Sequence, residues 1–141
     1  MSALPAPDRD SAPWWTALAD HRLMLQACRS CSTLRWAPRA LCNTCGSFEW
    51  SWQQSNGIGR VVTWMVSHRS YEADRQVPYV VVLVSMSEAP NIVVPGNWSG
   101  DPTGRDLSVG MDVTAGYTDL PTDSSNDPHS ILCWTNTPPP T

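Results

Sequence analysis

The sequence predicts a mainly β protein with a short N-terminal helix, a cysteine-bearing ribbon and a small closed barrel. Two Cys-x-x-Cys motifs lie ten residues apart in the first third of the chain. After the turn Ser55-Asn56-Gly57 the chain alternates β-branched apolar runs with loops rich in glycine, proline and aspartate, and shows no helical period. So few strands favour a closed barrel, because closure removes the unpaired edges of a sheet.

The N-terminal part of the chain predicts a short helix after a disordered lead. Residues 1–10 are polar and interrupted by two prolines, so we expect them to be disordered. Residues 11–22 predict the helix, with Ser11 as N-cap and Pro13 in the first turn. A helix of this length is not stable alone and must pack on the rest of the chain.

Residues 23–54 predict a two-stranded ribbon that carries the cysteines. Residues 23–27 form an apolar run before the first motif, and residues 48–53 alternate in polarity after the second. Phe48, Trp50 and Trp52 share one side of this second strand, and we expect them in the core.

We expect residues 55–135 to form the barrel. Residues 136–141 contain three prolines and are expected to form an extended, flexible tail. One strand is almost wholly apolar and is expected to be buried on both faces. Another is expected to end at Pro95-Gly96, with a loop from residue 97 to 104. The expected strands comprise residues 60–68, 79–86, 91–94, 112–117 and 131–134.

The four paired cysteines predict a zinc site. Two residues between thiols let one tight turn aim both sulfurs at one point, and a second turn completes a tetrahedron. Two disulfides or a redox motif would not explain two copies in one hairpin. Four protein ligands close the site, so the zinc would be structural. The ligands are Cys28, Cys31, Cys42 and Cys45; the fifth cysteine, Cys133, is expected to pack as a small hydrophobic residue.

Charge and motifs exclude several functions. The net charge is -4, which disfavours nucleic-acid binding. The sequence has no nucleophile elbow, P-loop or His-Glu-x-x-His motif, so we expect no catalysis by this chain. The N-terminus does not resemble a signal peptide and no apolar run is long enough to cross a bilayer, which predicts a cytoplasmic protein.

Eight tryptophans are an excess for 141 residues. Trp14 and Trp15 are adjacent on the expected helix and cannot both face one small core. Together with Trp36 they are candidates for a partner interface, since tryptophan is enriched at interaction hot spots. The alternative is that they pack on the ribbon and the barrel.

The order of these pieces resembles the family called domain of unknown function 35, an OB-fold with a rubredoxin-like zinc ribbon. Each matching stretch is short, and their order and spacing carry the resemblance. The stretches are Leu23-Met-Leu-Gln-Ala-Cys28-Arg-Ser-Cys31, Trp36-Ala-Pro38-Arg39, Cys42-Asn-Thr-Cys45-Gly46, Asn56-Gly57-Ile-Gly59-Arg-Val61, Pro78-Tyr79-Val80 and Val109-Gly110-Met111-Asp-Val113.

This resemblance implies a non-catalytic subunit that assembles with a thiolase-like or ketosynthase-like enzyme and supports binding of a CoA-thioester. Arg39 matches the family's Pro-Pro-Arg motif, with Ala37 in place of the first proline, and Arg39 and Arg35 are candidates for a CoA phosphate. Alternatively, Arg39 braces the ribbon against the barrel. Alternative functions are a partner of a MaoC-type enoyl-CoA hydratase and a single-stranded nucleic-acid module.

Overall fold

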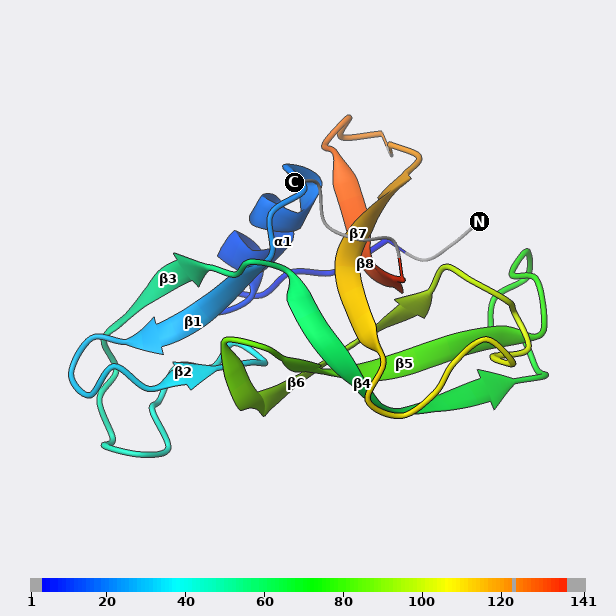
Figure 1. The fold of residues 1–141 in the computed structure, drawn as a ribbon. Coiled ribbons are helices and arrows are strands. Elements are labelled where there is room, and N and C mark those ends of the chain that lie inside the picture. Colours follow the sequence, from blue (N-terminus) through cyan, green and yellow to red (C-terminus); the bar gives the residue numbers. More distant parts are fainter. Residues whose placement is uncertain (1–3, 123, 137–141) are drawn as a thin grey trace.

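The structure, a computed structural model, describes residues 4–122 and 124–136. These residues contain one helix and eight strands. Three strands form a small ribbon sheet, and the other five form a closed barrel beside it (Figure 1). The mainly β fold with a short helix, a ribbon and a five-stranded barrel is therefore confirmed. In chain order the elements are α1 (Ala12–Ala19), β1 (Met24–Cys28), β2 (Leu34–Arg35), β3 (Trp50–Gln54), β4 (Ile58–Ser67), β5 (Tyr79–Met86), β6 (Ala89–Trp98), β7 (Asp112–Leu120) and β8 (His129–Thr135).

Helix α1, Ala12–Ala19, lies within the segment 11–22 that the sequence assigns to it. Ser11 is the N-cap residue, but its hydroxyl accepts a hydrogen bond from the backbone N–H of Asp8 instead of capping the helix. The Asp8 carboxylate in turn accepts the Ser11 N–H at 2.7 Å. At the other end His21 adopts a left-handed backbone conformation, with φ at 58°, and its N–H bonds to the carbonyl of Leu18. This turn closes the helix before residue 22.

The ribbon is a three-stranded antiparallel sheet in the order β2-β1-β3. β1 pairs with β3 from Met24 opposite Gln54 to Cys28 opposite Trp50. The short strand β2 was not predicted. The prediction for Phe48 was wrong: β3 begins only at Trp50, and the Phe48 side chain is 68% exposed.

The barrel closes in the order β4-β5-β6-β8-β7. Its weakest seam joins β6 and β8, which run parallel and pair only at Asn97 with Cys133 and at Trp98 with Trp134. β6 does not end at Pro95-Gly96 as expected. Pro95 lies where β6 is paired on one side only, the position in which a missing N–H is tolerated.

The bounds predicted for β5 are confirmed, but its burial on both faces is not. Val80, Val82, Val84 and Met86 are each at most 2% exposed and point into the barrel. The residues that alternate with them are only half-buried.

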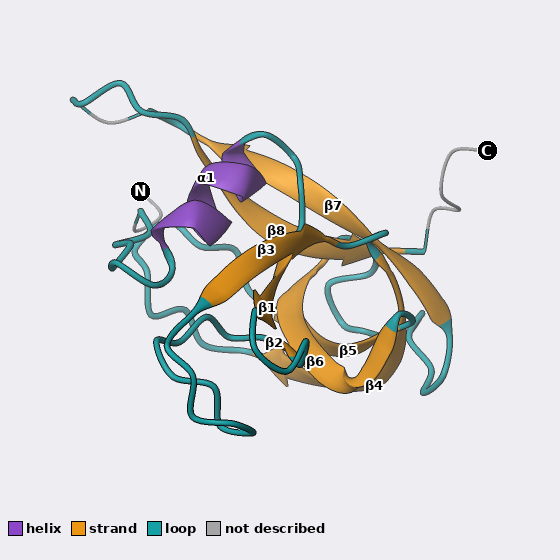
Figure 2. Cartoon of the chain, turned by 90° about the vertical axis from the view of Figure 1, so that its left-hand side faces the viewer, coloured by secondary structure: helices purple, strands orange, loops and turns teal. Residues whose placement is uncertain are grey.

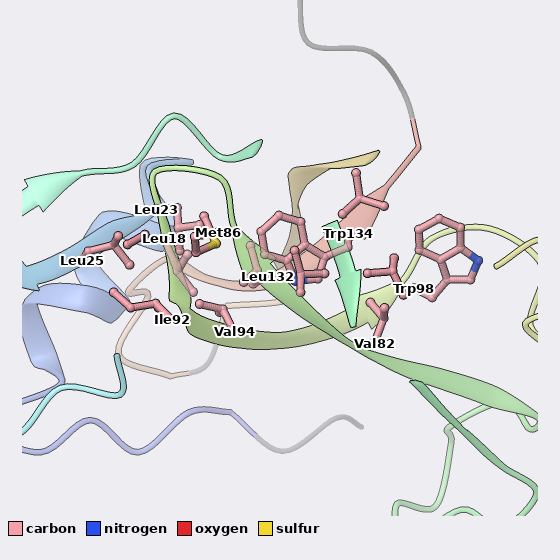
Figure 3. Close-up of a cluster of buried hydrophobic side chains, with 14 of the residues drawn as sticks. Leu18, Leu23, Leu25, Val82, Met86, Ile92, Val94, Trp98, Leu132 and Trp134 are labelled. Carbon is pink, nitrogen blue, oxygen red and sulfur yellow. The ribbon is translucent and has the colours of Figure 1, made fainter. Parts of the chain in front are cut away.

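Helix, ribbon and barrel share one hydrophobic core. Figure 3 shows Leu18, Leu23 and Leu25 meeting Met86 at one end of the barrel, with Trp134 farther inside. Trp134 is fully buried, and its ring lies so close to Gly96 that a β-carbon there would be 2.7 Å from the ring. The helix also packs on β8, as Figure 2 shows, so it depends on tertiary contacts as expected.

None of the helices in residues 4–122 and 124–136 is long and apolar enough to cross a membrane. Residues 1–3 and 137–141 lie outside the described residues, and with them most of the predicted flexible tail and part of the predicted disordered lead.

Candidate metal centre

The two cysteine motifs form matching turns at the tip of the ribbon. In the first, the N–H of Ser32 bonds to the carbonyl of Cys28 at 2.9 Å; in the second, the N–H of Gly46 bonds to the carbonyl of Cys42 at 2.8 Å. Ser32 and Gly46 both have positive φ, at 65° and 78°. Glycine adopts this conformation without strain, whereas the first turn uses it with a serine.

These turns bring four thiols together. The Sγ atoms of Cys28, Cys31, Cys42 and Cys45 all lie within 4.8 Å of one another. Cys28 Sγ is 3.5 Å from Cys45 Sγ, and Cys31 Sγ is 3.7 Å from Cys42 Sγ. A tetrahedral zinc with bonds of about 2.3 Å requires sulfur–sulfur edges of about 3.8 Å. The donor type, number and spacing therefore fit zinc.

Backbone N–H groups point at the sulfurs and favour thiolates. The N–H groups of Cys45 and Thr44 lower the pKa of Cys42 to about 6. The N–H of Ser47 acts in the same direction on Cys45, but the neighbouring thiols, chiefly Cys28, outweigh it and raise the pKa of Cys45 to about 12. Zinc would bind the thiolate forms, so its binding would displace the protons that remain on these sulfurs.

A buried polar contact behind the metal centre was not predicted from the sequence. Gln26 is fully buried on β1, and its side-chain oxygen accepts from Arg35 Nε at 2.6 Å and from the backbone N–H of Arg39 at 3.0 Å. Arg35 Nη2 also donates to the carbonyl of Arg39 at 3.0 Å. The only available signal was a glutamine in an otherwise apolar strand.

The two candidate arginines therefore occupy different environments. Arg35 is 5% exposed and its guanidinium contacts the ribbon itself. Arg39 is held by its backbone while its side chain is exposed. Both line a cavity of about 220 Å³ with Asn43, Thr44 and Asn91.

The three candidate interface tryptophans lie together. The Trp14 ring meets Trp15 edge-on at 4.8 Å and Trp36 at 5.8 Å. Trp14 is 6% exposed, whereas Trp15 and Trp36 are half-buried. All three line a groove of about 360 Å³ against β6 and β8.

Asp119 and the fifth cysteine lie outside the metal centre. Asp119 accepts hydrogen bonds from Ser130 Oγ at 2.6 Å and interacts with His21 Nε2 at 2.8 Å, which lowers the pKa of Asp119. Cys133 is half-buried on β8, and burial raises the pKa of its thiol.

A four-thiol ribbon joined to a five-stranded barrel defines a zinc-ribbon/OB-fold protein. Residues 15–51 match the family described as ChsH2, rubredoxin-like zinc ribbon domain, and residues 52–118 match the ChsH2 C-terminal OB-fold domain. The chain belongs to the domain of unknown function 35 family, as the sequence resemblance implied.

Solved structures support this membership. The chain is 31% identical to the structure described as Ltp2-ChsH2(DUF35) aldolase, with a TM-score of 0.78, over 93% of this chain and 97% of that one. A protein of unknown function from the same family in Sulfolobus solfataricus is 13% identical, with a TM-score of 0.57, over 90% of this chain and 84% of that one. This second likeness supports the fold alone.

Curated relatives are longer proteins. A probable enoyl-CoA hydratase alpha subunit of Thermomonospora curvata is 39% identical over 63% of this chain and 28% of its own length. The 3-oxo-4,17-pregnadiene-20-carboxyl-CoA hydratase alpha subunit of Mycobacterium tuberculosis is 31% identical over 83% of this chain and 36% of its own length. This chain thus spans about a third of the curated relatives that it matches.

Proposed function

We propose that this chain is a non-catalytic accessory subunit that assembles with a thiolase-superfamily enzyme and supports its action on a CoA-thioester. The observation that carries the proposal is the likeness to the Ltp2-ChsH2(DUF35) aldolase, which extends over nearly the whole of both chains. The reactive groups would belong to the partner.

The polar groups of the chain support a non-catalytic role. In the His21–Asp119–Ser130 contact the carboxylate lies between the hydroxyl and the imidazole. A hydrolytic triad requires the imidazole in the middle, as the base that takes the hydroxyl proton. This arrangement therefore does not activate Ser130.

The metal centre would hold one structural zinc ion. Four thiolates fill a tetrahedral shell and leave no position for water or substrate, so zinc here would stabilise the ribbon. The chain's own contribution is to hold Arg39, Arg35 and Trp36 at fixed positions beside the barrel.

Arg39 is the residue that we propose for a CoA phosphate. Burial and internal hydrogen bonds leave Arg35 as a brace for the loop that carries Arg39. Since a charge-assisted hydrogen bond contributes about 1.5 kcal/mol or more, Arg39→Ala should raise the KM of the complex for its CoA-thioester about tenfold. Arg29→Ala, an exposed arginine on the same ribbon, is the matched control and should leave KM unchanged. An unchanged KM in Arg39→Ala would remove this residue from the proposal.

Co-expression tests the assembly. The chain is produced together with a thiolase-like protein from its own organism, and an affinity tag is placed on that enzyme alone. Recovery of both chains in a fixed ratio after size-exclusion chromatography is the expected result. Separate elution at micromolar concentration would contradict the proposal.

The names of the curated relatives favour a second candidate, in which the partner is an enoyl-CoA hydratase. Under this alternative the chain would co-purify with a hydratase subunit of the MaoC type and not with the thiolase-like protein. Competition between the two enzymes for one tagged preparation of this chain distinguishes the two.

A further inference from the structure

β5 is apolar on both faces, yet only one face reaches the core. Val82 and Val84 are fully buried inside the barrel, whereas Val81 and Leu83 point outward and are half-buried. A strand that is apolar on both faces is typical of a sheet that is covered on both sides. Helix α1, the one helix among the described residues, makes its main contacts with β8 and β1 and not with the outer side of β5.

Neighbouring strands extend this apolar surface. The strand registers place Met65 of β4 beside Val81 and Pro95 of β6 beside Leu83, and Val93 stands opposite Ser85. Met65 is 55% exposed and Val93 is 36% exposed. We call Met65, Val81, Leu83, Val93 and Pro95 the outer face; its three strands form one wall of the barrel in Figure 2.

The outer face contains no charged side chain. Arg60, paired with Asp112 at 3.2 Å, stands opposite Ser85 and bounds one end. Tyr79, beneath the guanidinium of Arg75, bounds the other. Charge is depleted in the central part of protein interfaces, and this region has that composition.

The rim at the Tyr79 end carries two arginines, Arg69 and Arg75, in a loop that also holds Glu72 and Asp74. The Arg75 guanidinium lies 3.7 Å from the centre of the Tyr79 ring and donates to Asn97 at 2.9 Å. Arg69 lies over Tyr71 at 5.3 Å. Within residues 4–122 and 124–136, no ion pair joins either arginine to a carboxylate. Arg75 is therefore a cation without an ion pair at the rim of the outer face, in a groove that Glu72 also lines.

The outer face continues into the tryptophan groove. Val81 and Pro95 belong to the outer face and also line the groove that Trp15 and Trp36 border. The groove lies along β6 and β8, whose edges pair at only two positions. The outer face and the groove are thus continuous.

We propose that the outer face and the adjoining tryptophan groove are where the thiolase-like partner docks, and that the partner presents an uncharged apolar surface with a carboxylate opposite Arg75. Arg75 supplies the charge complementarity, and the uncharged centre supplies the buried area. This inference rests on the proposed function and assigns its interface.

The test measures binding of purified variants to the thiolase-like protein by titration calorimetry. Met65→Glu/Val93→Glu places two carboxylates on the outer face, and Arg75→Glu reverses the rim. Each should raise Kd at least about tenfold. Phe48→Glu, which changes a still more exposed apolar residue on the ribbon, is the control and should leave Kd unchanged. Zinc content and melting temperature show that each variant is folded.

The outcomes separate the two proposals. If the unsubstituted chain binds and the outer-face variants bind equally well, the docking surface is wrong and the accessory role stands. If the unsubstituted chain does not bind, the accessory role fails and the inference falls with it. A chain that dimerises alone and loses the dimer in Met65→Glu/Val93→Glu would assign the outer face to a second copy and overturn the inference.

Discussion

Zinc removal should unfold the cysteine-bearing part of the ribbon and leave the barrel folded. Residues 36–49 contain no helix or strand, and Cys42 is their one buried residue. Ordering a backbone costs about 1–2 kcal/mol per residue, so these residues require at least about 14 kcal/mol. Structural zinc sites contribute about 10–16 kcal/mol, which is the same magnitude. Apart from Trp36, which packs against the core, residues 36–49 bury little hydrophobic surface that could replace the metal.

The barrel has its own sources of stability. Val82, Val84 and Trp134 are fully buried far from the thiols, and β4, β5 and β6 form long antiparallel pairs. The base of β1 is held by Leu23 and Leu25, which belong to the same core. Loss of zinc should therefore stop at the base of the ribbon.

Amide hydrogen exchange measures this directly. In Cys42→Ser, or after chelation, amides of residues 28–49 should lose protection while those of β5 keep it. Cys133→Ser, which changes a cysteine outside the metal centre, is the control and should leave both regions unchanged. Unchanged protection of residues 28–49 in a preparation that elemental analysis finds free of zinc would refute the reasoning.

Three further predictions concern the barrel. Trp134→Ala removes the largest fully buried side chain and should cost about 3–5 kcal/mol in chemical unfolding. Gly96→Ala puts a β-carbon 2.7 Å from that ring and should lower the free energy of unfolding by about 1–3 kcal/mol. A smaller loss would show that β6 can move away from the ring. Hydrogen bonds from Ser130 and His21 lower the pKa of Asp119, so its stabilising effect is present above the ordinary pKa and is lost as pH falls through the lowered one. Asp119→Asn should therefore flatten the acid limb of the stability profile, and parallel profiles would contradict this.

Local patterns predicted the elements whose signals are contained in a few residues. Cysteine spacing located the metal centre, and the apolar run at residues 79–86 gave the bounds of β5. Both depend on spacing along the chain, which a sequence displays directly.

Features that depend on strand pairing could not be predicted in this way. The Gln26–Arg35 contact arises because β1 pairs with β2 and sets these two residues opposite each other. The passage of β6 through Pro95 depends on how little of β6 pairs with β8. Phe48 fits the alternation of aromatic and polar residues that includes Trp50 and Trp52, but β3 starts only at Trp50. The sequence pattern therefore begins before the strand does.

The burial of Arg35 changes how the candidate site is read. The sequence offered two arginines four residues apart as phosphate ligands, and Arg39 alone matched the family's motif. The structure uses one internally and leaves the other exposed at the same cavity. Sequence alone does not distinguish a bracing arginine from a binding one.

Acyl-CoA turnover tests the central claim most directly. The thiolase-like protein, this chain and their complex are assayed separately at equal concentration with the same CoA-thioester. The account predicts no turnover by this chain alone and higher kcat/KM for the complex than for the partner alone, with the gain lost in Cys42→Ser. Turnover by this chain alone, or a partner whose kcat/KM is the same with and without it, would contradict the account.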